Sequence, residues 1–314
     1  MCLLAVAAPF PIAAQGQEWP NRPIRIVVPF APGGPVDVVA RLLAEKLRPR
    51  LGQPLVIENR AGAGGSLGLR QVAQSPPDGS SFVLTSSSLA IWPALHPEAR
   101  FDPRTDMTPV SLIADIATTI VARPEPRLAT LADLLRLARA QPGSITYGTS
   151  GIGSSNHLSG ALFAARAGLQ LVHVPYRGAA VSMNALLARD IDIVFASTVE
   201  TLPAHRDGRA RILAVTTPQR IPALPDVPAA IELVPGYVAP NWFAMAGPPG
   251  LPAAILHRLA DALEDVGRDA DFRARLEHLG AIPVLSRPEV LAARLAEDIP
   301  TWRRIAEQEG IRPE

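Results

Sequence analysis

The residues of this sequence that are best suited to bind a ligand lie in short turns rich in glycine, serine and threonine. The turns comprise residues 31–35, 60–65, 86–88, 148–156, 175–179 and 196–198. Each turn follows an apolar run with the length of a buried strand, and most of them lead into a segment with helical periodicity. In open parallel sheets ligands bind outside the carboxyl ends of the strands, so these turns indicate where a ligand would bind.

The turn at residues 31–35 has the chemistry of an anion site. A helix N-terminus presents free N–H groups and a partial positive charge, and both favour an anion. Gly33 and Gly34 allow backbone amides to approach a ligand because glycine has no Cβ. Asp37 lies in the first helical turn, where we expect it to interact with the helix dipole or to cap the helix. Ligand contact is the weaker alternative for Asp37, because a carboxylate repels an anion.

Several side chains in these turns and strands have two possible roles. Arg177 either pairs with a ligand carboxylate through two parallel hydrogen bonds or is solvated at the rim of a cleft. Tyr176 either forms a wall of the site or packs, and Phe30 either covers the ligand or closes the core of its strand. For His157, at the start of a helix, ligand contact and local capping are equally favoured. His173 alternates with apolar residues, which favours a packed, hydrogen-bonded histidine.

The glycine-rich turns do not match the motifs of nucleotide-binding sites. Gly62, Gly64 and Gly68 have the spacing G-x-G-x-x-x-G, which is one residue longer than the dinucleotide fingerprint, and no acidic residue ends the next strand. Residues 148–154 have the spacing of a P-loop, but Ser154 occupies the position of the essential lysine. We therefore expect no nucleotide cofactor.

The other reactive residues form no recognisable metal or catalytic constellation. The six histidines show no i, i+4 pairing, and Cys2 is the only cysteine. Residues 148–151 are one residue short of the G-x-S-x-G nucleophile elbow. These observations predict a protein with no metal, no cofactor and no enzymatic activity.

Length, composition and element order predict an α/β protein of two lobes. The chain has 314 residues, about twice a typical single domain, and 48% of them are apolar. Strands are expected at residues 23–30, 55–58, 82–85, 145–147, 171–174 and 191–195. Their alternation with helices predicts mostly parallel sheets. Three further helices are expected at residues 253–266, 271–279 and 289–308. The net charge of +1 gives no reason to expect nucleic-acid binding.

The first residues have the pattern of a secretory signal. Residues 3–14 form an apolar run that ends in small residues and is too short to span a bilayer. We predict a signal peptide over residues 1–17, with cleavage near Ala14 and export of a soluble protein to the periplasm. No basic residue precedes the run, which is consistent with a start further upstream. Cys2 also precedes it, so we do not expect that cysteine to carry a lipid.

A series of short segments occurs in the order found in one family of transport receptors. They are PNRPIRIVVPF at residues 20–30, Gly33-Gly34, Asp37, NRAGAGG at 59–65, PDG at 77–79, FDP at 101–103, YGTSG at 147–151, VHVPYRG at 172–178, LPDVP at 224–228 and Trp242-Phe243. Each motif alone is weak, but the ordered set covers almost everything after the apolar run. The chain resembles the Bug (TctC-like) solute-binding receptors of tripartite tricarboxylate transporters.

The resemblance implies a two-lobed periplasmic binding protein of the Venus-flytrap kind, type II-like, with the ligand cleft between the lobes. One lobe would comprise residues 18–120 and 221–314, and the other residues 121–220. Proline-rich stretches at residues 123–126 and 218–228 mark the predicted crossings between the lobes.

The resemblance also assigns ligand-binding residues by position. In the first lobe, where one ligand carboxylate would be held, they are Phe30, Ala31, Pro32, Gly33, Gly34, Ser86, Ser87 and Ser88. In the second lobe they are Thr149, Ser150, Gly153, Ser154, Ser155, Asn156, His157, Tyr176, Arg177, Gly178, Ala196 and Ser197. Ala196 stands where many relatives have an acidic residue, which favours a ligand without an ammonium group. Arg177 stands where the family usually has lysine.

The function implied by the resemblance is capture of a small carboxylate, such as a di- or tricarboxylate or an aromatic carboxylate. The receptor would be a monomer that meets the membrane subunits of its transporter transiently. A periplasmic sensor that presents its ligand to a signalling protein is an alternative that the sequence leaves open, because the cleft would look the same. An enzyme on the same scaffold has no supporting motif.

The apolar run at residues 3–14 predicts that the mature protein begins near Gln15 when it is produced in a Gram-negative host. Signal peptidase should cut after the small residues that end the run. Mass spectrometry of the periplasmic fraction measures the N-terminus directly. An intact N-terminus on protein retained in the cytoplasm would contradict the prediction.

Overall fold

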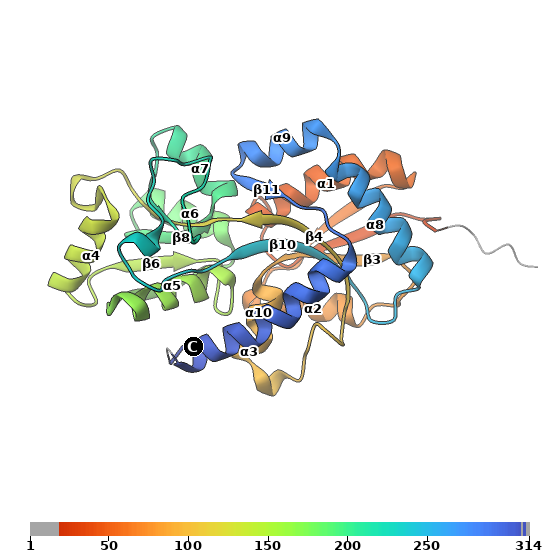
Figure 1. Ribbon diagram of the computed structural model, residues 1–314, viewed down its shortest axis with the longest axis horizontal. Coiled ribbons are helices and arrows are strands. Elements are labelled where there is room, and N and C mark those ends of the chain that lie inside the picture. The colour runs from red at the N-terminus through yellow and green to blue at the C-terminus, as the bar shows by residue number, and fades with distance from the viewer. Residues whose placement is uncertain (1–18, 309, 312–314) are drawn as a thin grey trace, which may run out of the picture.

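Two β-sheets with helices packed around them form the two halves of the molecule (Figure 1). The computed structural model describes residues 19–308, 310 and 311, so the expected signal peptide lies outside the described residues. The six-stranded sheet has the strand order β11-β4-β10-β3-β1-β2, and the five-stranded sheet has the order β7-β6-β8-β5-β9. The α/β fold with two lobes is therefore confirmed.

Strands of the first lobe come from both ends of the chain. They are β1 (Ile24–Val28), β2 (Leu55–Asn59), β3 (Ser81–Ser86), β4 (Thr108–Ile116), β10 (Asn241–Gly247) and β11 (Ala281–Pro283). Those of the second lobe come from the middle of the chain. They are β5 (Thr118–Ala122), β6 (Thr146–Thr149), β7 (Val172–Pro175), β8 (Ile193–Ser197) and β9 (Arg211–Val215).

The helices divide between the lobes in the same way (Figure 1). In the first lobe they are α1 (Pro35–Leu51), α2 (Ser66–Ala73), α3 (Ser88–Leu95), α8 (Ala253–Gly267), α9 (Ala270–His278) and α10 (Pro288–Gln308). In the second lobe they are α4 (Leu131–Ala140), α5 (Ser155–Ala167), α6 (Ala179–Ala188) and α7 (Thr198–Arg206). Single 3₁₀ turns occur at Ala63–Gly65, Pro97–Ala99, Pro126–Leu128 and Ala230–Glu232.

Helix α1 shows how the sequence pattern sets the packing. The apolar residues that repeat at helical spacing are all buried: Val36, Val39, Ala40, Leu43 and Leu47. They pack in one core cluster with β1, β3 and β10, so the periodic stripe faces the sheet. Pro35 occupies the first helical position, and Gly52 ends the helix in the left-handed conformation. The start of α1 is thereby fixed directly after the turn that follows β1.

The sheets are mixed, so the prediction of mostly parallel sheets was wrong. β1 pairs in parallel with β2 and β3, and β6 pairs in parallel with β7 and β8. The strands beside the lobe crossings, β4, β5 and β10, pair with their neighbours in the antiparallel direction. β5 and β10 follow directly from a strand or segment of the other lobe, with no helix packed on their own sheet before them. The rule that makes strand–helix–strand units parallel therefore does not apply to these two strands.

The chain passes between the two sheets twice. Only Ala117 separates β4 of the first sheet from β5 of the second. The return lies between Val215, at the end of β9, and Asn241, at the start of β10. We propose these two segments as the lobe boundaries in place of residues 120 and 220, because Ile120 lies inside β5.

The carboxylate of Asp37 fixes the turn between β1 and α1. It is buried and accepts hydrogen bonds from the Gly33 amide (3.0 Å) and from Nε and Nη2 of Arg41 (2.9 and 3.0 Å). Asn59, at the end of β2, donates both to Asp37 (3.0 Å) and to the carbonyl of Phe30 (3.1 Å). Burial alone disfavours the charged form, but the hydrogen bonds and the charge of Arg41 outweigh it and lower the pKa of Asp37. Asp37 therefore orders the turn through Gly33, Arg41 and Asn59, and it does not cap α1.

Replacing Asp37 by asparagine should lower the free energy of unfolding by about 1–3 kcal/mol at neutral pH, because the charged acceptor of the Arg41 and Gly33 hydrogen bonds is lost. Since the folded-state pKa is lowered, this stabilisation is fully present above the unfolded-state pKa of about 3.9 and is lost as the pH falls through the folded-state pKa.

Urea unfolding of wild type and Asp37→Asn at pH of about 7 and about 3 tests this dependence. The stability difference should shrink at the lower pH. The control Asp207→Asn removes one partner of an exposed ion pair with Arg209 and should change little. A stability difference for Asp37→Asn that does not decrease with pH would contradict the assignment.

Candidate ligand-binding site

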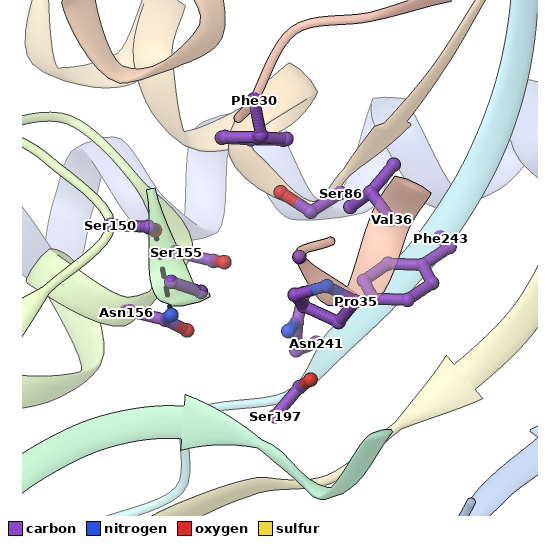
Figure 2. A pocket seen from close by; sticks show the side chains of 12 residues that line it. Phe30, Pro35, Val36, Ser86, Ser150, Ser155, Asn156, Ser197, Asn241 and Phe243 are labelled. Atoms are coloured by element: carbon purple, nitrogen blue, oxygen red, sulfur yellow. Dashed lines mark hydrogen bonds between the residues drawn. The ribbon is translucent and has the colours of Figure 1, made fainter. Parts of the chain in front are cut away.

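A cavity lies between the lobes, where the carboxyl ends of β1, β3, β6 and β8 face one another (Figure 2). It contains about 350 Å³ of empty space, part of which is open to solvent. We call it the inner cavity. It is lined by Phe30, Gly34, Pro35, Val36, Ser86, Asn241 and Phe243 from the first lobe and by Ser150, Ser155, Asn156, Ala179 and Ser197 from the second.

Four helices begin at the inner cavity, namely α1, α5, α6 and α7. The N-cap residues of three of them, Gly34, Gly178 and Ser197, make no side-chain hydrogen bond to the first helical turn. The first-turn N–H groups of these helices therefore lack the usual side-chain acceptor. Only α5 is capped in this way, by Ser154, which accepts a hydrogen bond from the His157 amide (3.2 Å). Together the helix ends place partial positive charge around the cavity, which favours an anion.

Hydroxyl groups enter the inner cavity from both lobes. Figure 2 shows Ser86 of the first lobe and Ser197 of the second directed toward its middle. The Oγ of Ser86 shares a hydrogen bond with the Oγ of Ser88 (2.9 Å). Within the described residues, the buried Oγ of Ser197 has no hydrogen-bond partner. Because an unpartnered buried hydroxyl costs free energy, a ligand that bonds with Ser197 offsets this cost.

The side-chain amide of Asn241 is held in one orientation. Its Oδ1 accepts hydrogen bonds from the Oγ of Ser87 (2.8 Å) and from the amide of Trp242 (2.9 Å). Its Nδ2 donates to the Oγ1 of Thr118 (3.5 Å) and carries a second hydrogen. Because Oδ1 is engaged, the NH₂ group is what Asn241 offers to a ligand in the cavity, and this group is a donor.

None of the residues that line the inner cavity is charged. Phe30, Phe243, Pro35 and Val36 supply apolar walls, and the polar groups are hydroxyls and amides. The preference for an anion therefore comes from backbone N–H groups and neutral donors. An acidic partner for a ligand ammonium group is missing from this lining.

The residues predicted from the sequence divide into three groups. Lining the inner cavity are Phe30, Gly34, Ser86, Ser150, Ser155, Asn156 and Ser197. Buried but outside the lining are Ser87, Ser88, Thr149, Gly153, Ser154, His157, Gly178 and Ala196. More exposed and also outside the lining are Ala31, Pro32, Gly33, Tyr176 and Arg177.

Gly33 does not provide the amide approach that the sequence suggested. It is exposed, and its N–H donates to Asp37 instead of facing the cavity. A Cβ built on Gly33 meets nothing within 4 Å, so a side chain there would not fill the inner cavity. Of the two adjacent glycines, only Gly34 lines the inner cavity, because Asp37 turns the preceding amide away.

Two stacked histidines support the second lobe beneath the turn at residues 149–154. The rings of His157 and His173 stack with centroids 4.4 Å apart. The ring of Tyr147 also stacks with His173, at a centroid distance of 4.9 Å. The Nδ1 of His157 accepts a hydrogen bond from the Gly153 amide (3.2 Å). Burial, with a smaller contribution from His173, lowers the pKa of His157 to about 4, so its ring is neutral at physiological pH. His157 therefore orders the turn from behind the lining.

Pro35, Val36, Ala179, Asn241 and Phe243 also line the inner cavity but were not predicted as site residues. Pro35 and Ala179 lie in two of the turns that the sequence indicated, at the starts of α1 and α6, but were not named as site residues. Val36 is the next residue of α1, so extending that turn by one residue would have found it. Asn241 and Phe243 lie in β10, far along the chain from the other turns. Of these two, only Phe243 carried a sequence signal, in the Trp242-Phe243 segment of the family pattern.

A second cavity adjoins the first. It contains about 580 Å³ of empty space and is lined by residues 29–30, 61–65, 150–152 and 175–177. We call it the outer cavity. Phe30 and Ser150 line both cavities, so the two cavities adjoin at these residues. Tyr176 and Arg177, which the sequence predicted for the site, lie in the outer cavity and not in the inner one.

The two lobes touch through glycines beside the outer cavity. A Cβ built on Gly64 would overlap the carbonyl oxygen of Ile152 in the opposite lobe. A Cβ on Gly178 would lie 2.8 Å from the Cβ of Ala31, also across the cleft. Such distances are shorter than real Cβ contacts allow, so side chains at these positions would hold the lobes apart.

The family model described as tripartite tricarboxylate transporter family receptor matches residues 39–311 of this chain. The chain belongs to this family. It is thus a member of the solute-binding receptors that the sequence motifs indicated.

Solved structures of related proteins have the same fold as this receptor. The periplasmic binding protein BugD is 34% identical, with a TM-score of 0.90 over 94% of this chain and 100% of BugD. Rpa4515 of R. palustris, solved with adipate, is 32% identical, with a TM-score of 0.90 over 95% of this chain and 100% of Rpa4515. MatC of Rhodopseudomonas palustris, with bound malate, is 32% identical, with a TM-score of 0.87 over 91% of this chain and 99% of MatC.

The described part of the receptor contains neither a membrane-spanning helix nor a cluster of metal ligands. None of its helices combines the length and apolarity needed to cross a bilayer. No group of three or more histidine, cysteine, aspartate and glutamate side chains in that part is arranged to hold a metal ion.

Replacing Gly64 by alanine should shift the receptor toward an open arrangement of the lobes, because the added Cβ overlaps Ile152. Gly208→Ala is the matched control. Both glycines have positive φ, +62° and +70°, so both alanines carry a similar backbone strain of about 1–2 kcal/mol, but Gly208 has nothing within 4 Å. Solution X-ray scattering should give a larger radius of gyration for Gly64→Ala than for wild type or Gly208→Ala. Equal radii for all three proteins would show that this contact does not limit closure.

Proposed function

We propose that this receptor captures a small organic acid in the periplasm and releases it, unchanged, to the membrane subunits of a tripartite tricarboxylate transporter. The observation that carries the proposal is the convergence of four helix N-termini on an uncharged cavity between two lobes. Such a cavity offers N–H and O–H donors and no anionic side chain, so it matches a ligand group that only accepts hydrogen bonds. A carboxylate is that group.

The relatives support a carboxylate as the ligand. Rpa4515 was solved with adipate and MatC with malate, and both share the fold of this chain over more than nine tenths of its length. Adipate and malate have two carboxylates each and no ammonium group. The absence of acidic side chains from the inner lining agrees with a ligand of this class, because an ammonium group would find no anionic partner there. Ala196 leaves the second lobe without the acid that many relatives have.

The arrangement of the polar groups favours binding without reaction. A serine nucleophile needs a base within hydrogen-bond reach. Ser86 is bonded to Ser88, and no histidine, aspartate or glutamate lines the inner cavity beside Ser197. The histidine of the second-lobe turn, His157, accepts from the Gly153 amide behind the lining. The site therefore has donors to hold an anion and no activated group to attack it.

Transport requires release of the ligand as well as its capture. Because the site is divided between the lobes, separation of the lobes can release the ligand. α1 belongs to the first lobe, whereas α5, α6 and α7 belong to the second. Separation of the lobes removes part of the donors from the ligand and exposes the rest to water. We propose that the receptor acts as a monomer that closes on its ligand and opens when it meets the transporter transiently.

Calorimetry and thermal unfolding of the receptor with adipate, with malate and with their dimethyl esters test the proposal. At least one of the two acids should bind and raise the melting temperature by roughly 4 °C at 100 times its Kd, a concentration at which binding adds about 2.7 kcal/mol. The esters should shift the melting temperature much less, because they lack the anionic oxygen atoms that helix N-termini favour.

Ser197→Ala should weaken binding of the acid about tenfold, since it removes one donor to a charged group. Ser144→Ala is the matched control, because Ser144 is an exposed serine of the same lobe whose hydroxyl bonds to Gln141. Recovery of the ligand after denaturation shows whether it was altered. An ester that binds as tightly as its acid, or a ligand recovered as a different compound, would overturn the proposed function.

A further inference from the structure

The outer cavity contains a cationic side chain that the inner cavity lacks. Among the residues that line it, Arg177 is the only one with a charge. Within the described residues, the guanidinium of Arg177 has no ion pair and no hydrogen bond. Arg60, at the start of the glycine-rich turn that forms another wall, is instead paired with Glu58. Arg177 is therefore the uncompensated positive charge at this opening.

The remaining walls of the outer cavity suit a hydrocarbon segment. Pro29, Phe30, Ile152, Pro175 and Tyr176 contribute apolar surface. The other side chains are alanine, glycine and Ser150, so few hydroxyl or amide groups compete for a polar ligand. A chain of methylene groups or an aromatic ring fits these walls, and the guanidinium beside them fits a terminal carboxylate.

The two cavities are adjacent, because Phe30 and Ser150 line both of them. The inner cavity surrounds one carboxylate with neutral donors, and the outer cavity offers one cation. A ligand that reached both would need two carboxylates separated by a spacer long enough to pass Phe30. A short dicarboxylate would leave Arg177 without a partner.

We propose that this receptor is selective for elongated dicarboxylates, with one carboxylate in the inner cavity and the other paired with Arg177 in the outer cavity. This inference rests on the proposed function, because it takes the inner cavity to hold the first carboxylate. Arg177 is then a specificity-determining residue, and the spacer between the carboxylates sets which acids are preferred. The pairing is bidentate, since a guanidinium matches the geometry of a carboxylate.

Calorimetry with succinate, suberate and octanoate on wild type and Arg177→Ala tests the pairing. Octanoate has the chain length of suberate but lacks the second carboxylate. Wild type should bind suberate at least about fivefold more tightly than octanoate or succinate, as expected for a charge-assisted pair that is partly open to water. Arg177→Ala should lose this preference for suberate, while its affinity for octanoate should stay within about twofold of wild type.

Two controls separate pairing from general effects of charge and shape. Arg139→Ala removes the same charge from an exposed position on α4 of the same lobe and should leave the suberate preference unchanged. Arg177→Lys should retain part of it, because lysine keeps the charge but loses the planar pair of donors. If Arg177→Ala weakened octanoate and suberate equally, or if wild type bound both equally, the outer-cavity pairing would be wrong and the proposed function would stand. If wild type bound no carboxylate in these or the earlier measurements, both proposals would fail.

Discussion

The N–H groups at the starts of four helices are the constraint on which the rest of this receptor depends. A helix cannot satisfy its first-turn donors internally, and Gly34, Gly178 and Ser197 supply no side-chain acceptor for them. An N–H group that is buried away from water without a hydrogen-bond acceptor costs free energy. The closed form is therefore incomplete by itself, and an occupant rich in acceptors completes it. In the proposed mechanism, closure and anion binding are one event, because the groups that attract the ligand are those that closure buries.

The charged side chains are placed so that they do not compete with these N–H donors for the ligand. Asp37 is buried close to the start of α1, but Arg41 neutralises it and its hydrogen bonds tie down the turn, so it orders the amides without repelling a ligand. Full charges are absent from the inner lining, where an unpaired ion would be costly to desolvate. The first contact with an anion can be made by Arg177 in the outer cavity, which is more exposed and where solvation of the free guanidinium costs little. Lobe contacts through Gly64 and Gly178 then bring backbone close to backbone around the ligand.

The features that depend on short stretches of chain were determined by the sequence alone. The apolar stripe of α1, the ends of β1, β3, β6 and β8, and the turns that follow them can be predicted from periodicity and turn residues. The hydroxyl residues Ser86, Ser155 and Ser197 could be named for the same reason, since each stands at the end of a predicted strand or at the start of a helix. The ordered motifs also identified the family, and the family carries the two-lobed fold.

Other features were decided only when distant segments came together. β10 is buried on both faces and so shows no alternation of apolar and polar residues, which is why neither the strand nor Asn241 was recognised. The antiparallel strands at the crossings depend on the path between lobes, and that path has no local signature. The amide of Gly33 donates to Asp37, and Arg177 lines the outer cavity and not the inner one. Local sequence sets which groups each turn offers, but the packing of one lobe against the other decides which of them face the same space.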